Sequence, residues 1–266
     1  MNKKNPFISL VKCDILQGIV SNWYYFAAAL IVVFFAMNDY HNSIMNDIEI
    51  RSFTFMDCLK EFFMGVQDSV DNPEFQFPTV FLSYLIIPFI VTSFYPASDF
   101  LERAKVIFIR TEKKSVWWYS KCVWMIVGVL FYMAFFYLGM LIFSAIFGDI
   151  SLSLVDRADG IPMSVADRLL QFIVLPVVTT ISLSLAQMVI SVAATPLYGV
   201  MAQIAQMTLS IIYISPILPG NFYMYMRSSF YREDGVNVVT ALVVCLVISV
   251  VSVVAGKFIV DRKDII

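Results

Sequence analysis

The stretch DFLERAKVIFIRTEKKSVWWYSK, residues 99–121, lies between two long apolar segments and sets the interpretation of the whole chain. It carries six basic and three acidic residues, which makes it too polar to cross a lipid bilayer. Leu101, Ala104, Ile107 and Phe108 recur with the spacing of one helical face. We therefore expect a short amphipathic helix at the start of this stretch.

A basic turn and an aromatic cluster follow the expected helix. Trp117, Trp118 and Tyr119 form the cluster, and such side chains favour the level of the lipid headgroups. Two interpretations of the stretch remain open at this point. It is either a basic loop that only fixes the orientation of the protein, or a docking element that receives force from a cytosolic partner.

The composition of the chain indicates a membrane protein. Of its 266 residues, 60% are hydrophobic and only 14% are charged, whereas soluble domains contain about 25% charged residues. A helix needs about 20 apolar residues to span a bilayer, and six segments meet that length. We predict an all-α polytopic protein in which residues 1–266 form a single transmembrane domain. The predicted spans are residues 19–37, 79–97, 122–147, 169–194, 197–217 and 236–257.

The distribution of basic residues predicts the orientation. With the N-terminus inside, the two terminal segments and residues 99–121 hold twelve Lys and Arg residues, against six in the opposite loops. Because basic residues gather on the cytoplasmic side, we expect both termini in the cytoplasm of a multi-pass cytoplasmic membrane protein. On this topology Cys58 is the cysteine outside, and we expect an impermeant thiol reagent added outside to label it.

Residues 5–18 are expected to form an interfacial helix on the inner leaflet or, equally, an extension of the first span. Lys12 and Asp14 are expected to lie away from its apolar face. The residues expected on that face are Phe7, Leu10, Val11, Ile15 and Ile19.

Two further helical segments are expected on the outside. In the loop 38–78 an amphipathic helix either lies on the outer leaflet or caps the bundle, and residues 221–234 are expected to form short re-entrant or interfacial helices. The residues expected on the apolar face of the first segment are Met56, Leu59, Phe63 and Val66, with Asp57, Lys60 and Glu61 facing away.

Polar side chains gather on one face of each of the fourth and fifth spans. Buried polar groups in hydrocarbon need partners. They either join helices by hydrogen bonds or line a wetted translocation surface. These candidate lining residues are Thr180, Ser184, Gln187, Ser191, Gln203, Gln206 and Ser210.

Several chemistries are absent from the sequence. There is no GxxxxGK[ST] motif for nucleotide binding, no HExxH and no GxSxG, and His41 is the single histidine. No predicted span carries a charge near its centre, which argues against a proton- or sodium-coupled carrier. Energy for transport would then come from a partner. We expect neither a catalytic site nor a cofactor or metal site on this chain.

The layout resembles the membrane subunit of type-2 ABC exporters. The resemblance covers the whole arrangement, with an inner amphipathic N-terminal helix, six spans, a basic amphipathic helix after the second span and a broken helical region before the last. The residues that fit the family pattern are Glu102–Arg103, Val106–Ile109, Lys114–Ser115, Lys121 and the tail from Phe258 to Ile265. The usual Gly after the Glu and the Pro in the turn are missing.

The resemblance implies a transmembrane dimer, homo- or heteromeric, with two cytosolic ATPase subunits that bind ATP and Mg. The substrate would be a peptide, an antibiotic or another amphipathic molecule, as in the export or immunity branch of the family. The segment near 100–110 would be the coupling helix that enters a groove on the ATPase. Its contact residues would be Phe100, Leu101, Glu102, Arg103, Ile107, Phe108 and Arg110. The alternative is a non-transporting membrane anchor or sensor that recruits a cytosolic ATPase.

Overall fold

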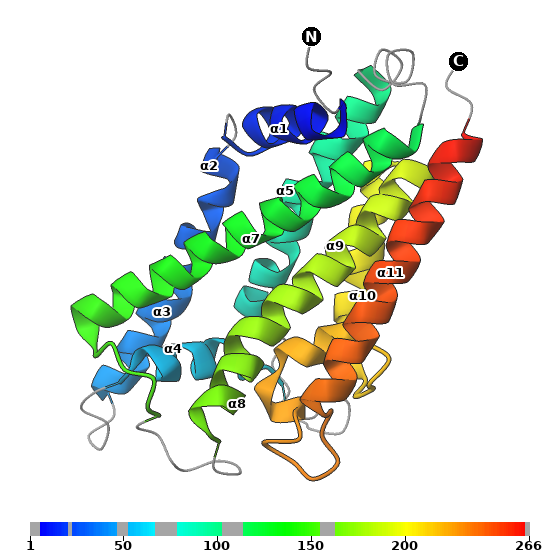
Figure 1. Ribbon diagram of the computed structural model, residues 1–266. Coiled ribbons are helices and arrows are strands. Elements are labelled where there is room, and N and C mark those ends of the chain that lie inside the picture. Colours follow the sequence, from blue (N-terminus) through cyan, green and yellow to red (C-terminus); the bar gives the residue numbers. More distant parts are fainter. Residues whose placement is uncertain are drawn as a thin grey trace.

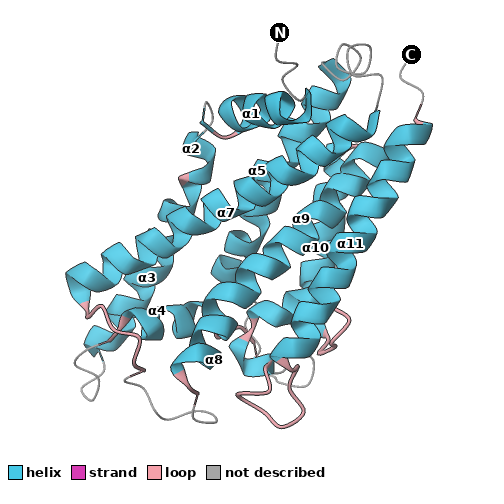
Figure 2. Cartoon of the chain, viewed as in Figure 1, coloured by secondary structure: helices cyan, strands magenta, loops and turns pink. Residues whose placement is uncertain are grey.

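The computed structural model describes residues 6–20, 23–46, 53–66, 79–102, 114–154 and 163–263. These residues form an elongated helical bundle, and both chain ends lie at the same end of it (Figure 1). Within the described ranges there are helices and loops but no strand, as Figure 2 shows. The prediction of an all-α membrane protein is confirmed at this level.

The helices of the described ranges have the following order along the chain. They are α1 (Pro6–Gly18), α2 (Trp23–Phe26), α3 (Ala28–Asn46), α4 (Phe55–Phe62), α5 (Thr79–Glu102), α7 (Lys114–Phe147), α8 (Val165–Leu169), the π-helical turn η2 (Leu170–Val174), α9 (Leu175–Ala193), α10 (Pro196–Ile212), the 3-10 turns η3 (Pro219–Tyr223) and η4 (Tyr225–Arg227), and α11 (Val238–Arg262).

Five helical segments of the described chain are long and apolar enough to cross a membrane. They are Trp23–Asn42, Phe81–Phe100, Lys114–Phe147, Val165–Ala193 and Val238–Arg262. The fifth predicted span, 197–217, is longer than the helix found there, since α10 ends at Ile212 after 17 residues. Pro216 explains this end, since a proline removes a helical donor and disfavours helix in the residue before it.

The expected boundary between the second and third spans is wrong. The helix α5 continues to Glu102 and α7 begins at Lys114, so the aromatic cluster belongs to a spanning helix. Trp117 and Trp118 are fully buried, not at the lipid surface, and only Tyr119 is exposed. The two indoles are buried because each donates its N–H within the bundle, to Asp99 and to the carbonyl of Val253.

The first helix lies across the end of the bundle that carries both chain ends (Figure 1). Its least exposed residues have the spacing predicted for the apolar face, and Ile8 and Leu16 are exposed on the other side. Asp14 is an exception to the prediction, because its side chain lies buried in the middle of the inward face. A carboxylate tolerates such a place only when it is paired.

The opposite end of the bundle is closed by α4 and the two 3-10 turns. A capping box between Thr54 and Asp57 starts α4, which packs against α3 and α7. The backbone N–H groups of Tyr225 and Met226 donate to the carbonyls of Phe63 and Met64. Of the two alternatives for the segment in loop 38–78, the structure therefore supports the one in which it caps the bundle.

The charged side chains of α4 do not all face away from the bundle, as the sequence suggested. Asp57 and Lys60 are buried, and of the three charged residues only Glu61 is exposed. The carboxylate of Asp57 accepts hydrogen bonds from the backbone and the hydroxyl of Thr54. These capping hydrogen bonds explain why the Asp57 side chain lies inside the bundle.

A proline interrupts the long helical segment formed by α8, η2 and α9. Pro176 has no N–H to give to the preceding turn, which has widened into the π-helical turn η2. The hydroxyl of Tyr137 on α7 lies 3.0 Å from the carbonyl oxygen of Phe172 and 3.1 Å from that of Ile173. The single O–H of this side chain supplies a donor, shared between the two carbonyls, in place of the N–H that the turn lacks.

Candidate functional site

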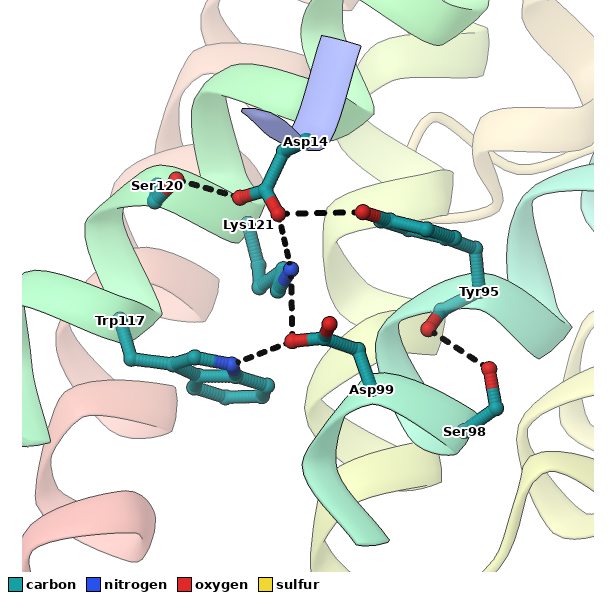
Figure 3. A network of polar contacts seen from close by, with 7 residues as sticks. All are labelled: Asp14, Tyr95, Ser98, Asp99, Trp117, Ser120 and Lys121. Carbon is teal, nitrogen blue, oxygen red and sulfur yellow. Dashed lines mark hydrogen bonds and ion pairs between the residues drawn. The ribbon is translucent and has the colours of Figure 1, made fainter. Parts of the chain in front are cut away.

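A buried ionic network joins three helices at the end of the bundle that carries the chain ends (Figure 3). The ammonium group of Lys121, on α7, lies 2.5 Å from Asp14 Oδ1 on α1 and 2.8 Å from Asp99 Oδ2 on α5. All three side chains are at least 95% buried. Two carboxylates share one ammonium group, so the network carries a formal charge of −1.

Neutral donors complete the network around the two carboxylates. Ser120 donates to Asp14 Oδ2, and the hydroxyl of Tyr95 donates to Asp14 Oδ1 at 3.1 Å. The indole N–H of Trp117 donates to Asp99 Oδ2 at 2.8 Å. Lys121 also lies 4.8 Å from the centre of the Tyr95 ring, a cation–π distance. These contacts offset the cost of burying an excess negative charge.

The network controls the position of α1 relative to the bundle. Asp14 is the buried charge on α1, and its partners come from residues 81 to 107 positions away in sequence. Removing one partner from a buried ion pair costs about 3–5 kcal/mol, because the other charge stays buried without compensation. Helix α1 is therefore held by specific polar contacts in addition to its apolar face.

Two lysines link the start of α7 to α11 and then α11 to α9. Lys114 donates to the carbonyls of Asp261 and Lys263 at 3.2 and 2.9 Å. Lys263 donates to the carbonyl of Val192 at 2.7 Å. A cation at a helix C-terminus satisfies carbonyls that have no helical donor and complements the helix dipole. The start of α7 thus contacts α1, α5 and the end of α11, and Lys263 in turn links that end to α9.

The predicted coupling residues fall into two groups. The first group is described by the structure, and in it Phe100 is buried inside the bundle. The centre of its ring lies 5.1 Å from that of Trp117 and 5.5 Å from the ammonium group of Lys263. Its apolar surface therefore packs within the bundle and is not available to a partner protein. Leu101 and Glu102 belong to the last turn of α5. Arg103, Ile107, Phe108 and Arg110 lie outside the described residues.

The structure brings the polar faces of α9 and α10 together. Gln203 donates its amide N–H to the carbonyl of Leu183 on α9, and Gln187 donates to the carbonyl of Phe89 on α5. All the predicted lining residues are buried except Gln206, which is half-buried. The buried members are Thr180, Ser184, Gln187, Ser191, Gln203 and Ser210.

The hydroxyl groups along these faces differ in their hydrogen bonding. Thr180 donates to the carbonyl of Pro176 and lies 2.8 Å from the hydroxyl of Tyr223. Ser210 donates to the carbonyl of Gln206. Ser184 and Ser191 have no hydrogen-bond partner among the described residues. The faces therefore combine satisfied packing contacts with unsatisfied polar atoms.

Arg227 is a buried cation that the sequence did not single out. Its guanidinium donates to the carbonyls of Ser210 and Ile211 at the end of α10, and to the side chain of Asn221. Its Nε atom donates to the carbonyl of Val66, 2.9 Å away. The planar fork of five donors suits the several carbonyls at a helix end. Arg227 lies inside the aromatic stretch 221–234, after Pro216 and Pro219, and this local sequence gave no signal of its burial.

No protein-family model, no curated protein and no solved structure matches this chain. Among the described residues, no group of three or more His, Cys, Asp or Glu side chains is arranged to hold a metal ion. The function is therefore inferred from the geometry of the chain.

Proposed function

We propose that this chain is the transmembrane permease subunit of an ATP-driven ABC exporter. It moves a peptide, an antibiotic or another amphipathic substrate across the cytoplasmic membrane, and a separate cytosolic subunit binds ATP and Mg and hydrolyses the nucleotide. A second transmembrane subunit, identical or different, completes the pathway. Both termini of the chain lie in the cytoplasm.

The observation that carries this proposal is the ionic network around Lys121. Asp99 lies before residues 103–113 and Lys121 lies after them, and the two side chains are joined at 2.8 Å. A displacement applied to residues 103–113 therefore reaches α5, α7 and α1 together instead of being absorbed by a flexible connection. Rigid-body movement of packed helices is a common route for transmitting a remote event.

Lys114 and Lys263 support the same proposal. They extend the connected region from the start of α7 to the ends of α9 and α11. Because α9 carries one of the two polar faces, a shift at the cytosolic end would reach the proposed translocation surface. The docking contacts themselves belong to residues 101–110.

Co-purification with the ATPase tests the proposal. Phe108→Ala, or Glu102→Ala together with Arg103→Ala, should leave the subunit folded and inserted but reduce bound ATPase or stop transport while ATP hydrolysis continues. Truncating one partner of a desolvated charge pair costs roughly 2–5 kcal/mol at an interface. Glu233→Ala is the control, because this exposed side chain lies beyond the cap at the other end. Wild-type ATPase binding and transport in both test variants would contradict the proposal.

A second candidate function is a non-transporting anchor or sensor that recruits a cytosolic ATPase. The burial of both polar faces between α9, α10 and α5 favours it, because an anchor needs no open path. The two candidates differ in one result. An anchor binds the ATPase through residues 101–110 but moves no substrate in reconstituted vesicles, whereas an exporter does both.

A further inference from the structure

Four buried oxygen atoms along the contact between α9 and α10 have no hydrogen-bond partner within the described part of the chain. They are the Oγ atoms of Ser184 and Ser191 and the Oε1 atoms of Gln187 and Gln203, here called the acceptor seam. Each of these side chains is more than nine-tenths buried. Unsatisfied polar atoms are few in native proteins, so four in one place need an explanation.

The orientation of the two amides is fixed by their nitrogen atoms. Gln187 Nε2 donates to the carbonyl of Phe89 at 2.8 Å, and Gln203 Nε2 donates to the carbonyl of Leu183 at 3.2 Å. Turning either amide over would place its oxygen against a carbonyl oxygen, which also only accepts. Both Oε1 atoms are therefore left to accept from a further donor.

The members of the seam lie along one line of contact between the helices. Gly199 on α10 passes so close to α9 that a side chain there would collide with Ser191 and Gln187. The hydrogen bond of Gln203 to the carbonyl of Leu183 places its amide beside the residue that precedes Ser184. A molecule that reached one acceptor would find the others nearby along the same contact between α9 and α10.

The chemistry of the seam selects the kind of ligand. Amide and hydroxyl oxygens accept hydrogen bonds but bring no formal charge, and a bare cation buried in hydrocarbon requires charge compensation. Neutral N–H donors carry no such requirement. A peptide backbone presents them repeatedly along its length.

We infer that the acceptor seam binds backbone amide N–H groups of the transported molecule when α10 moves away from α9. This inference rests on the proposed exporter function and narrows its substrate class to peptides with free backbone N–H groups. Substrate binding then satisfies the oxygens that are without donors in the closed packing.

A pair of probes tests this recognition on the purified full-length protein in lipid nanodiscs. The first probe is N-acetyl-trileucine amide, and the second is the same peptide with its backbone nitrogens methylated. The midpoint of thermal unfolding is measured against probe concentration, because a ligand that binds only the folded protein raises it. The first probe should raise the midpoint progressively once its concentration exceeds the dissociation constant, and the methylated probe should leave it unchanged.

Two serine variants locate the binding site. Changing Ser184→Ala and Ser191→Ala together removes two acceptors and breaks no hydrogen bond within the described chain, so the variant should fold as well as the native protein. Its apparent affinity for the first probe should fall about tenfold, the effect of losing one or two hydrogen bonds. Ser182→Ala is the matched control, because Ser182 is equally buried on α9 but bonds to the carbonyl of Thr179.

The results separate this inference from the proposed function. Three results would overturn the inference: the two probes stabilise the protein equally, neither probe stabilises it, or the double serine variant binds the first probe with unchanged affinity. The seam would then hold only water. ATPase co-purification judges the exporter proposal independently, because the seam variants leave residues 101–110 untouched.

Discussion

The hydroxyl group of Tyr137 lies 3.0 Å from the carbonyl oxygen of Phe172, in a turn that Pro176 deprives of an N–H donor. A side chain of α7 thereby donates a hydrogen bond to a backbone carbonyl in the π-helical turn before α9. Tyr137→Phe should lower stability by about 1–3 kcal/mol, the usual cost of a buried acceptor left without a donor. The midpoint of thermal unfolding in detergent measures the effect.

A second substitution checks the reason for that cost. Pro176→Ala supplies an N–H to the same turn, so Tyr137→Phe should cost less in a Pro176→Ala background than in the native protein. Equal costs in the two backgrounds would show that the Tyr137 hydroxyl does not serve the proline-containing turn.

The ionic network gives a prediction with an internal control. Lys121→Met leaves Asp14 and Asp99 buried without their ammonium partner and should destabilise the protein by about 3–5 kcal/mol. Replacing both carboxylates as well, with Asp14→Asn and Asp99→Asn, should recover much of that loss. Thermal unfolding of the single and triple variants makes the comparison. A triple variant less stable than Lys121→Met alone would contradict the pairing of these charges.

Thiol labelling distinguishes Cys13 from Cys58. Burial, and next the charge of Asp57, raise the pKa of the Cys58 thiol to about 12, and its side chain is fully buried. A raised pKa keeps the thiol protonated, so the reactive thiolate is scarce at pH 8. The buried position of Cys58 therefore predicts, against the expectation from the sequence, that this thiol is not labelled from outside in the folded protein. In detergent at pH 8, maleimide should label the exposed Cys13 and leave Cys58 unmodified until the protein unfolds.

The same reagent tests the orientation of the bundle. An impermeant maleimide added to intact cells should leave Cys13 unlabelled, and labelling should begin once the membrane is opened. Labelling of Cys13 from outside would place α1 and the ionic network on the outer side. The docking proposal would then fail.

The hydrogen bonds of Arg227 predict that lysine and arginine at this position differ in the stability they give the protein. Its guanidinium donates to Ile211 and Val66 through separate nitrogens, a geometry that a lysine does not reproduce. Arg227→Lys should therefore lose most of the stability that Arg227→Met loses, although it keeps the charge. Nearly native unfolding of Arg227→Lys would mean that charge alone is sufficient at the end of α10.

Local patterns in the sequence predicted most of the helices but not the contacts between them. The apolar runs located five of the six predicted spans among the described residues, and the polar residues predicted to share a face on α9 and α10 are mostly buried. The spacing of Phe7, Leu10 and Val11 also predicted the inward face of α1. These features repeat within a few residues of the chain, which is why periodicity detects them.

The buried charges were missed because their partners are distant in sequence. Asp14 has the helical spacing of the inward face of α1, although we expected it to lie away from that face. A carboxylate on an inward face needs a partner of opposite charge beside it inside the bundle, and this is the signal that could have revealed the pairing. Lys121 was counted among the basic residues of a cytosolic stretch, yet it pairs with Asp14 across 107 positions. Hydropathy treats such residues as exposed, since it contains no information about pairing.

The hydrogen bonds of Lys114 have a consequence for biosynthesis. Its acceptor on Lys263 lies 149 positions further along the chain. At a synthesis rate of about 5–20 residues per second, roughly 7–30 s separate the translation of the donor from that of the acceptor. The start of α7 enters the membrane before its final neighbour exists. The end of the bundle that holds Lys114 is therefore completed last, after the opposite cap, whose residues 53–66 and 219–227 are all translated earlier.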